Sequence, residues 1–126
     1  MSTQLVSIII SCKNESPRIE RLLRSIQVQS YKKIELIIVD NFSTDNTKII
    51  AQRYTQQVYF LGPERSPQRN FGAKRSHGTF ILFLDADMEL PSQIIAECVK
   101  NIGSKPAVII PETVPGRSFF LQNKTT

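Results

Sequence analysis

The sequence predicts an α/β fold in which helices cover both faces of a mostly parallel β-sheet. Short β-branched or apolar runs alternate with segments of helical periodicity, and turn residues separate them. This alternation favours parallel strands joined by right-handed crossovers, a Rossmann-like arrangement. A chain of 126 residues, 40% of them hydrophobic, is long enough for one core. We therefore expect one domain over residues 1–121 and a frayed tail over 122–126.

The first strand is expected at Val6–Ile10, where the residues are β-branched and mostly apolar. The loop Ser11–Glu15 leads out of this strand. Ser16 and Pro17 then have the pattern of a helix N-cap and a first helical residue. The helix they open is amphipathic, because its apolar residues recur at i, i+3, i+4 and i+7: Ile19, Leu22, Leu23 and Ile26.

The second strand is expected at Ile34–Val39, which is nearly all apolar and ends at Asp40. Ser43 or Thr44 can cap a helix that runs to about Tyr54. The remaining elements are expected in this order: a strand at Val58–Leu61, a helix opened by Ser66-Pro67 and closed by Gly78, a strand at Thr79–Leu84, a helix from Pro91 to Gly103 and a strand at Ala107–Ile110.

Polar side chains follow three of the predicted strands at the point where each strand ends. The carboxyl ends of parallel strands lie at one edge of a sheet, where open α/β folds hold their ligands. The exit loops Ser11–Glu15, Asp40–Ser43 and Asp85–Glu89 should therefore meet at this edge. Three such loops together predict a binding site.

Asp85 and Asp87 come directly after the apolar run that ends at Leu84. In extended chain, side chains at i and i+2 point the same way, so both carboxylates could face one spot. Close carboxylates repel each other unless a proton or a cation lies between them. Mg²⁺ and Mn²⁺ prefer oxygen ligands and commonly bridge to phosphates, so the pair suggests a metal–phosphate site. A strand that ends in an Asp-rich turn is the alternative, and the pair alone leaves both open.

The net charge of +5 suits an anionic ligand, an anionic membrane surface or nucleic acid, and does not choose among them. The chain has no zinc-finger or RNA-binding signature, so we predict no nucleic-acid partner. It has no apolar run long enough to span a membrane and no signal-like start. We expect a cytoplasmic protein, with association at the membrane surface left open. Cys12 and Cys98 are expected to be small buried residues.

Six short motifs occur in order over residues 5 to 90: Val6-Ser-Ile-Ile-Ile, Asn14-Glu15, Ile37-Ile-Val-Asp40, Ser43-Thr44-Asp45, Arg69-Asn70-x-Gly72 and Phe83-Leu-Asp85-Ala-Asp87. Together they resemble the nucleotide-sugar-binding half of a GT-A glycosyltransferase of family 2. The ordered set is specific, whereas each motif alone is weak. The fold that the resemblance implies agrees with the fold predicted from periodicity.

The resemblance implies roles for residues on all three loops. Asp40 would accept a hydrogen bond from the base of the sugar donor. Ser11, through its backbone, and Asn14 and Glu15 would surround the base and ribose. Arg69 would help to hold the nucleotide.

The same resemblance implies a Mn²⁺ or Mg²⁺ cofactor. Asp85 would lie near the ribose and the metal, and Asp87 would ligate the metal at the diphosphate. Asn41 stands where the family often has a second Asp, and we assign it no role.

We therefore expect a metal-dependent transferase that moves a sugar from a UDP- or GDP-sugar to an unknown acceptor, with inversion. The alternative is a module that binds the nucleotide sugar without transferring it. Family members are usually longer, and their second half supplies acceptor contacts and a catalytic carboxylate. After Pro111 the only carboxylate is Glu112, so the sequence identifies no general base. A homo-oligomer or a partner chain that completes the acceptor site is left open.

Overall fold

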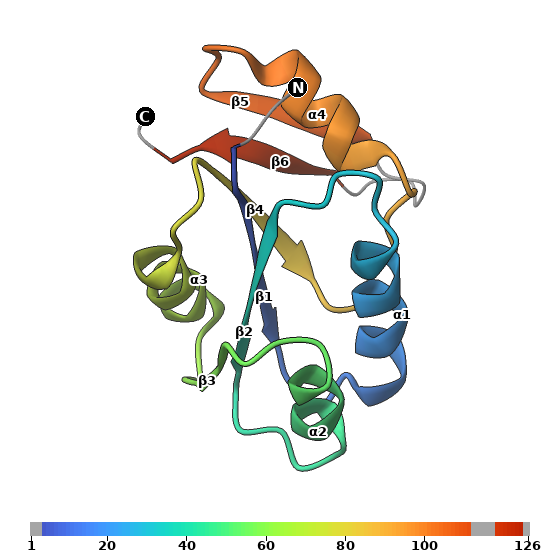
Figure 1. Ribbon diagram of the computed structural model, residues 1–126. Coiled ribbons are helices and arrows are strands. Elements are labelled where there is room, and N and C mark those ends of the chain that lie inside the picture. Colours follow the sequence, from blue (N-terminus) through green and yellow to red (C-terminus); the bar gives the residue numbers. More distant parts are fainter. Residues whose placement is uncertain (1–3, 112–117, 125–126) are drawn as a thin grey trace.

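The chain forms a six-stranded β-sheet with helices on both faces in the computed structural model, which describes residues 4–111 and 118–124 (Figure 1). The strands are β1 (Val6–Cys12), β2 (Ile34–Asp40), β3 (Val58–Phe60), β4 (Phe80–Asp85), β5 (Ala107–Pro111) and β6 (Ser118–Asn123). The helices are α1 (Ser16–Gln27), α2 (Thr47–Gln52), α3 (Arg65–Arg75) and α4 (Ile94–Ile102). Across the sheet, the strand order is β3-β2-β1-β4-β6-β5.

Strand β1 lies inside the parallel part of the sheet, between β2 and β4. All seven of its residues are buried, which explains why its sequence is an almost continuous apolar run. Alternate side chains point to opposite faces. Ile8 and Ile10 belong to the larger core cluster, which includes residues of α1, α2 and α4, whereas Ile9 packs in the smaller cluster with Phe71 of α3.

The two helix layers confirm the predicted fold class. In Figure 1, α3 lies on one side of the parallel strands and α1 on the other. Helix α3 packs very close to the sheet at Gly72, since a Cβ atom added there would lie 2.6 Å from Cγ2 of Ile9. A larger residue at Gly72 would push α3 away from β1.

Strand β6 was not predicted. It lies antiparallel between β4 and β5, and Gln122 and Asn123 pair with Ile81 and Phe80. The prediction that the chain frays from Gln122 was therefore wrong for these two residues. The physical reason is that β4 would otherwise end the sheet, whereas β6 covers its edge and buries Leu121 completely.

All four helices begin at residues other than those predicted. Helices α1 and α3 begin at Ser16 and Arg65, one and two residues before Pro17 and Pro67, which were expected to be their first helical residues. Helix α2 begins at Thr47 instead of after Ser43 or Thr44, because hydrogen bonds hold those two residues in the preceding loop. Helix α4 begins at Ile94, three residues after Pro91. Strands β1 and β2 end at Cys12 and Asp40, two residues and one residue later than predicted, and the polar loops that follow them lie at one edge.

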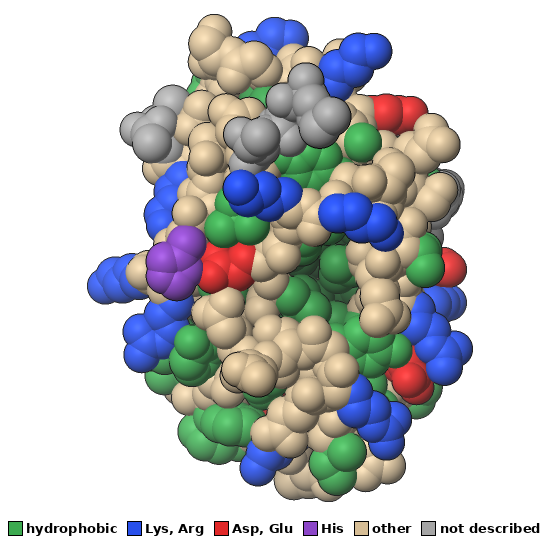
Figure 2. All heavy atoms as spheres, viewed as in Figure 1, with side chains coloured by type: hydrophobic (Ala, Val, Ile, Leu, Met, Phe, Trp, Pro, Cys, Tyr) green, Lys and Arg blue, Asp and Glu red, His purple; other side chains and the backbone are tan. Residues whose placement is uncertain are grey.

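The surface visible in Figure 2 carries Lys and Arg side chains that are scattered and do not form one basic area. Such isolated cations are typical of a solvated surface. Within residues 4–111 and 118–124, no helix has the length and apolar character that crossing a bilayer requires.

Candidate functional site

The register of the parallel strands brings the predicted loops together. Ser11, near the end of β1, lies between Val39 of β2 and Asp85 of β4. Cys12 is opposite Asp40. The carboxyl ends of β1, β2 and β4 therefore meet at one edge of the sheet, as the sequence predicts.

A cavity of about 540 Å³ opens at this edge. Its lining includes four of the seven residues proposed from the sequence: Ser11, Glu15, Asp85 and Asp87. The other lining residues are Cys12, Lys13, Asn41, Pro63, Arg65, Gln68 and Ala86. Asn14, Asp40 and Arg69 are not among the lining residues, although each is next to or contacts one of them. The wall thus combines carboxylates with cations, which suits a ligand that carries both phosphate and metal.

Two arginines of α3 approach the carboxylate of Asp85. Arg65 Nη1 lies 3.5 Å and Arg69 Nη2 lies 3.7 Å from the same atom, Asp85 Oδ1. The two arginines are four residues apart and so lie on one face of the helix. The Nε atom of Arg69 is buried and has no hydrogen-bond partner among the described residues.

Asp87 lies in the turn that follows β4, not in extended chain. The alternation rule that predicted a common direction for Asp85 and Asp87 therefore does not apply, yet both line the cavity. Arg21 of α1 donates a hydrogen bond from Nη2 to the carbonyl oxygen of Asp87, at 3.2 Å. Arg21 Nε also lies 3.9 Å from a carboxylate oxygen of Glu89. Helix α1 therefore holds the backbone of the turn that carries Asp87.

Asp40 is almost fully buried, with 1% of its surface exposed. Its carboxylate accepts hydrogen bonds from the backbone N–H of Ser43, at 3.0 Å, and from the Ser43 hydroxyl, at 2.5 Å. The Cys12 thiol donates a third, weaker bond at 3.5 Å. Burial and then the charge of Asp40 raise the pKa of Cys12 far above its usual range, so this thiol stays protonated. Asp40 thus fixes the loop between β2 and α2.

Hydrogen bonds join the segments that follow β1 and β2. Asn14 N donates to Ser43 Oγ at 2.8 Å, and Asn14 Oδ1 accepts from Thr44 N at 2.8 Å. Glu15 N donates to Thr47 Oγ1 at 2.9 Å. Asn14 has a φ of 52°, in the left-handed region that Asn tolerates better than most residues. These contacts make the paired loops one unit at the edge of the sheet.

Among the lining residues that sequence reasoning did not propose, four have a charged or amide side chain: Lys13, Asn41, Arg65 and Gln68. Arg65 had a signal, because it lies four residues before Arg69 and must share its helix face. Gln68 is buried and donates a hydrogen bond from Nε2 to the carbonyl oxygen of Val39, at 2.9 Å. It anchors α3 to the end of β2.

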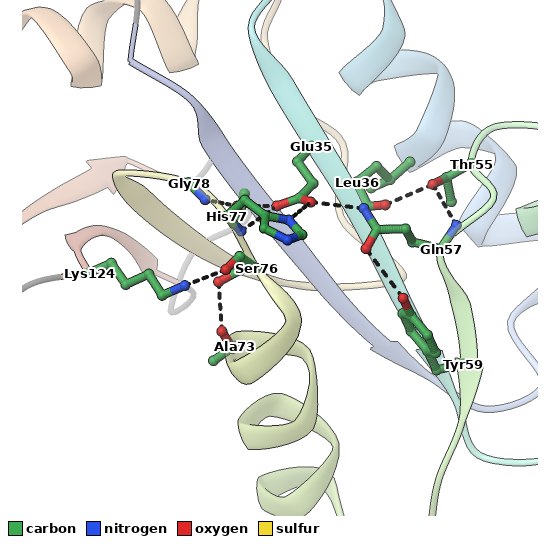
Figure 3. A network of polar contacts seen from close by, with 11 residues as sticks. Glu35, Leu36, Thr55, Gln57, Tyr59, Ala73, Ser76, His77, Gly78 and Lys124 are labelled. Atoms are coloured by element: carbon green, nitrogen blue, oxygen red, sulfur yellow. Dashed lines mark hydrogen bonds and ion pairs between the residues drawn. The ribbon is translucent and has the colours of Figure 1, made fainter.

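A second polar network surrounds Glu35 and involves none of the residues that line the cavity (Figure 3). Glu35 accepts hydrogen bonds from Ser7 Oγ at 2.7 Å, Gln57 Nε2 at 2.9 Å and His77 N at 2.8 Å. His77 Nδ1 lies 2.7 Å from its second oxygen. Burial by itself raises the pKa of Glu35, but these hydrogen bonds together lower it to about 2. The His77 side chain is largely exposed, and it covers the outer side of this network through its contacts with Glu35.

The carboxylate oxygens at the cavity fit a divalent cation whose coordination is completed by phosphate oxygens of a bound ligand. The described residues contain no group of three or more His, Cys, Asp or Glu side chains placed to hold a metal by themselves. Asp85 and Asp87 nevertheless supply two carboxylates to one cavity. Mg²⁺ is typically bound through one or two carboxylates, with phosphate oxygens and water completing its coordination.

Comparison with known proteins identifies the family. The model of "Glycosyl transferase family 2" matches residues 7–124. A curated relative, the GalNAc(5)-diNAcBac-PP-undecaprenol beta-1,3-glucosyltransferase of Campylobacter jejuni, is 33% identical over 106 residues. That match covers 76% of this chain and 34% of the relative.

Solved structures agree with this match. S. aureus TarS in complex with UDP-GlcNAc has a TM-score of 0.75 at 27% identity, over 90% of this chain and 36% of TarS. The mannosyltransferase PcManGT of Pyrobaculum calidifontis, in complex with GDP-Man and Mn²⁺, has a TM-score of 0.75 at 24% identity, over 86% of this chain and 35% of that one. This second likeness shows the fold. The chain spans about a third of the length of each of these relatives. A family model that covers nearly all of the sequence and a shared GT-A fold lead to one conclusion: the chain belongs to glycosyltransferase family 2.

Proposed function

We propose that this chain binds a nucleoside diphosphate sugar, a UDP- or GDP-sugar, and acts in the transfer of its sugar to an acceptor. The observation that carries the proposal is the cavity where β1, β2 and β4 end, with Asp85, Asp87 and an arginine in its wall. Membership of the family supports it. The complex of TarS with UDP-GlcNAc, a relative of 27% identity, supports a nucleotide sugar as the ligand.

Asp85 and Asp87 are the residues that would hold Mn²⁺ or Mg²⁺ in this cavity. The cation would supply Lewis acidity that stabilises the leaving diphosphate. Arg69 would bind a phosphate oxygen through its guanidinium, because its side chain is 40% exposed and lies beside Asp85. Asp40 and the joined loops of Ser11, Asn14 and Glu15 would hold the base and ribose, because they lie at the same edge of the sheet.

A module that binds the nucleotide sugar without transferring it is the second candidate. It is favoured because each described carboxylate that lines the cavity already has another partner or role. Glu15 forms an ion pair of 3.0 Å with Arg18, and Asp85 and Asp87 are assigned to the metal. None of these three is then left as a general base, which must come within hydrogen-bond reach of the acceptor hydroxyl. Product formation by the purified chain, with a broad acceptor panel, separates the two candidates.

A thermal-shift panel tests the binding step that both candidates share. UDP-, GDP- and dTDP-sugars are each added to the protein with Mn²⁺ and with EDTA. A ligand at 100 times its Kd stabilises the folded state by about 2.7 kcal/mol. We expect one UDP- or GDP-sugar to raise Tm in Mn²⁺ and to have little effect in EDTA. If no nucleotide sugar raises Tm under either condition, the proposed function is wrong.

A further inference from the structure

Arg65 stands at the mouth of the cavity, as the first residue of α3. Its side chain is 63% exposed, and its Nη1 atom lies 3.5 Å from Asp85 Oδ1, beyond the usual range of a charge-assisted hydrogen bond. An exposed ion pair of this length adds little to stability. The guanidinium of Arg65 is therefore held only weakly at Asp85 and can move.

Arg69 approaches the same carboxylate oxygen from the next turn of α3, at 3.7 Å. Its guanidinium also lies 5.7 Å from the ring centre of Phe83, and its side chain is less exposed than that of Arg65, 40% against 63%. Arg69 is thus the better fixed of the two. Two guanidinium groups thus share one carboxylate oxygen.

A divalent cation at Asp85 would change this balance. It carries two positive charges and would bind the carboxylate that Arg65 contacts in this structure. Like charges at such short distances repel strongly, and the weakly held guanidinium is the one that can leave. A diphosphate in the same cavity gives it a new partner, because the planar guanidinium fork matches phosphate oxygens.

We propose that Arg65 is a second phosphate-binding arginine of this site, and that it exchanges partners. It pairs with Asp85 when the site is free of nucleotide, and with the diphosphate when metal and nucleotide are bound. The inference rests on the function proposed above. It goes beyond the motif that carries the family resemblance, which includes Arg69 but not Arg65.

Calorimetry on Arg65→Gln and Arg65→Lys tests the phosphate contact. Whichever of UDP or GDP the wild-type protein binds is titrated with Mn²⁺, and NMR titration gives the affinity of the matching nucleoside. Arg53→Gln, an exposed arginine of another helix end, is the matched control. We expect Arg65→Gln to weaken the nucleotide roughly ten-fold or more, as for a lost hydrogen bond to a charged group. Arg65→Lys should retain part of the affinity, and the nucleoside should bind all variants alike.

The exchange of partners has its own readout, the affinity of the nucleotide-free protein for Mn²⁺, measured by electron paramagnetic resonance. Arg65→Gln should bind Mn²⁺ more tightly than wild type, because a competing cation has been removed. An unchanged Mn²⁺ affinity overturns the exchange. Equal losses for nucleotide and nucleoside, or no loss for either, overturn the phosphate contact. If the wild-type protein binds neither UDP nor GDP, the proposed function has failed and this inference fails with it.

Discussion

Asp40 shows how a residue proposed for ligand binding can also be a structural anchor. The resemblance assigns its carboxylate to the base of the nucleotide, whereas the structure buries it and satisfies it with Ser43 and Cys12. A carboxylate can accept several hydrogen bonds, so the two roles are compatible. The burial of Asp40 implies that removing the carboxylate costs stability as well as any contact with a ligand.

Asp40→Ala is expected to lower the unfolding free energy by about 1–3 kcal/mol, because the donors of Ser43 lose a buried acceptor. It should also weaken the nucleotide. Ser43→Ala is the matched control, since it removes the hydroxyl bond to Asp40 and keeps the carboxylate. Urea unfolding and nucleotide titration are compared for both variants. If Asp40 contacts the base, Asp40→Ala should lose much more nucleotide affinity than Ser43→Ala. Equal losses in the two variants would show that Asp40 has only a structural role.

Glu35 makes stability depend on pH. Its pKa is lowered to about 2 in the folded protein, so the folded state favours the ionised form. The stabilisation is therefore present above the pKa of the unfolded chain and is lost as the pH falls from about 5 towards 2, by roughly 1–3 kcal/mol. Urea unfolding between pH 6 and pH 3 measures this loss. Glu35→Gln should be less stable at pH 6 and should show a flatter pH dependence; a slope equal to that of wild type would contradict the account.

At the scale of elements, helix α3 connects the core to the site. Its inner side is held against the sheet by Gly72, next to Ile9, and by the hydrogen bond from Gln68 to Val39. Its first two turns carry Arg65 and Arg69. The position of both guanidiniums therefore depends on how closely α3 packs.

Gly72→Ala is expected to destabilise the protein by about 1–3 kcal/mol, because the new methyl group would overlap Ile9 and force α3 outwards. The same shift should weaken nucleotide binding. Asn70→Ala, an exposed position of the same helix, is the control and should leave stability within about 0.5 kcal/mol of wild type. Urea midpoints of the three proteins measure the effect. A Gly72→Ala variant as stable as wild type would show that the helix adjusts without cost.

The elements also show what the sequence could and could not predict. Strands β1, β2 and β4 are largely buried, so their apolar runs could be recognised in the sequence. The ends of these runs correctly placed Ser11, Asp85 and Asp87 at one edge of the sheet. Strand β6 was missed because its pairing with β4 joins residues about forty positions apart, which no local pattern reports. Arg65 was missed because its role depends on a contact with Asp85, which belongs to another element. Its spacing of four residues from Arg69 was visible in the sequence.

At the scale of the whole molecule, the strand order explains where the cavity lies. The chain builds β1, β2 and β3 outwards in one direction, and α3 then returns across the other face to place β4 on the opposite side of β1. The order of the strands therefore reverses between β1 and β4. Ligands of open α/β sheets bind at such a reversal, outside the carboxyl ends of the strands. Ser11 and Asp85 are paired at this point.

The most direct test of the account is a calorimetric titration of UDP and GDP into the protein, with Mn²⁺ and then with EDTA. Asp87→Asn, which keeps the shape of the side chain and removes its charge, is measured alongside. We predict that one nucleotide binds in Mn²⁺, and that EDTA or Asp87→Asn weakens it at least ten-fold, because the diphosphate then faces the carboxylates of the cavity with little screening. Equal affinity in Mn²⁺ and in EDTA, unchanged by Asp87→Asn, would contradict a metal–nucleotide site at Asp85 and Asp87.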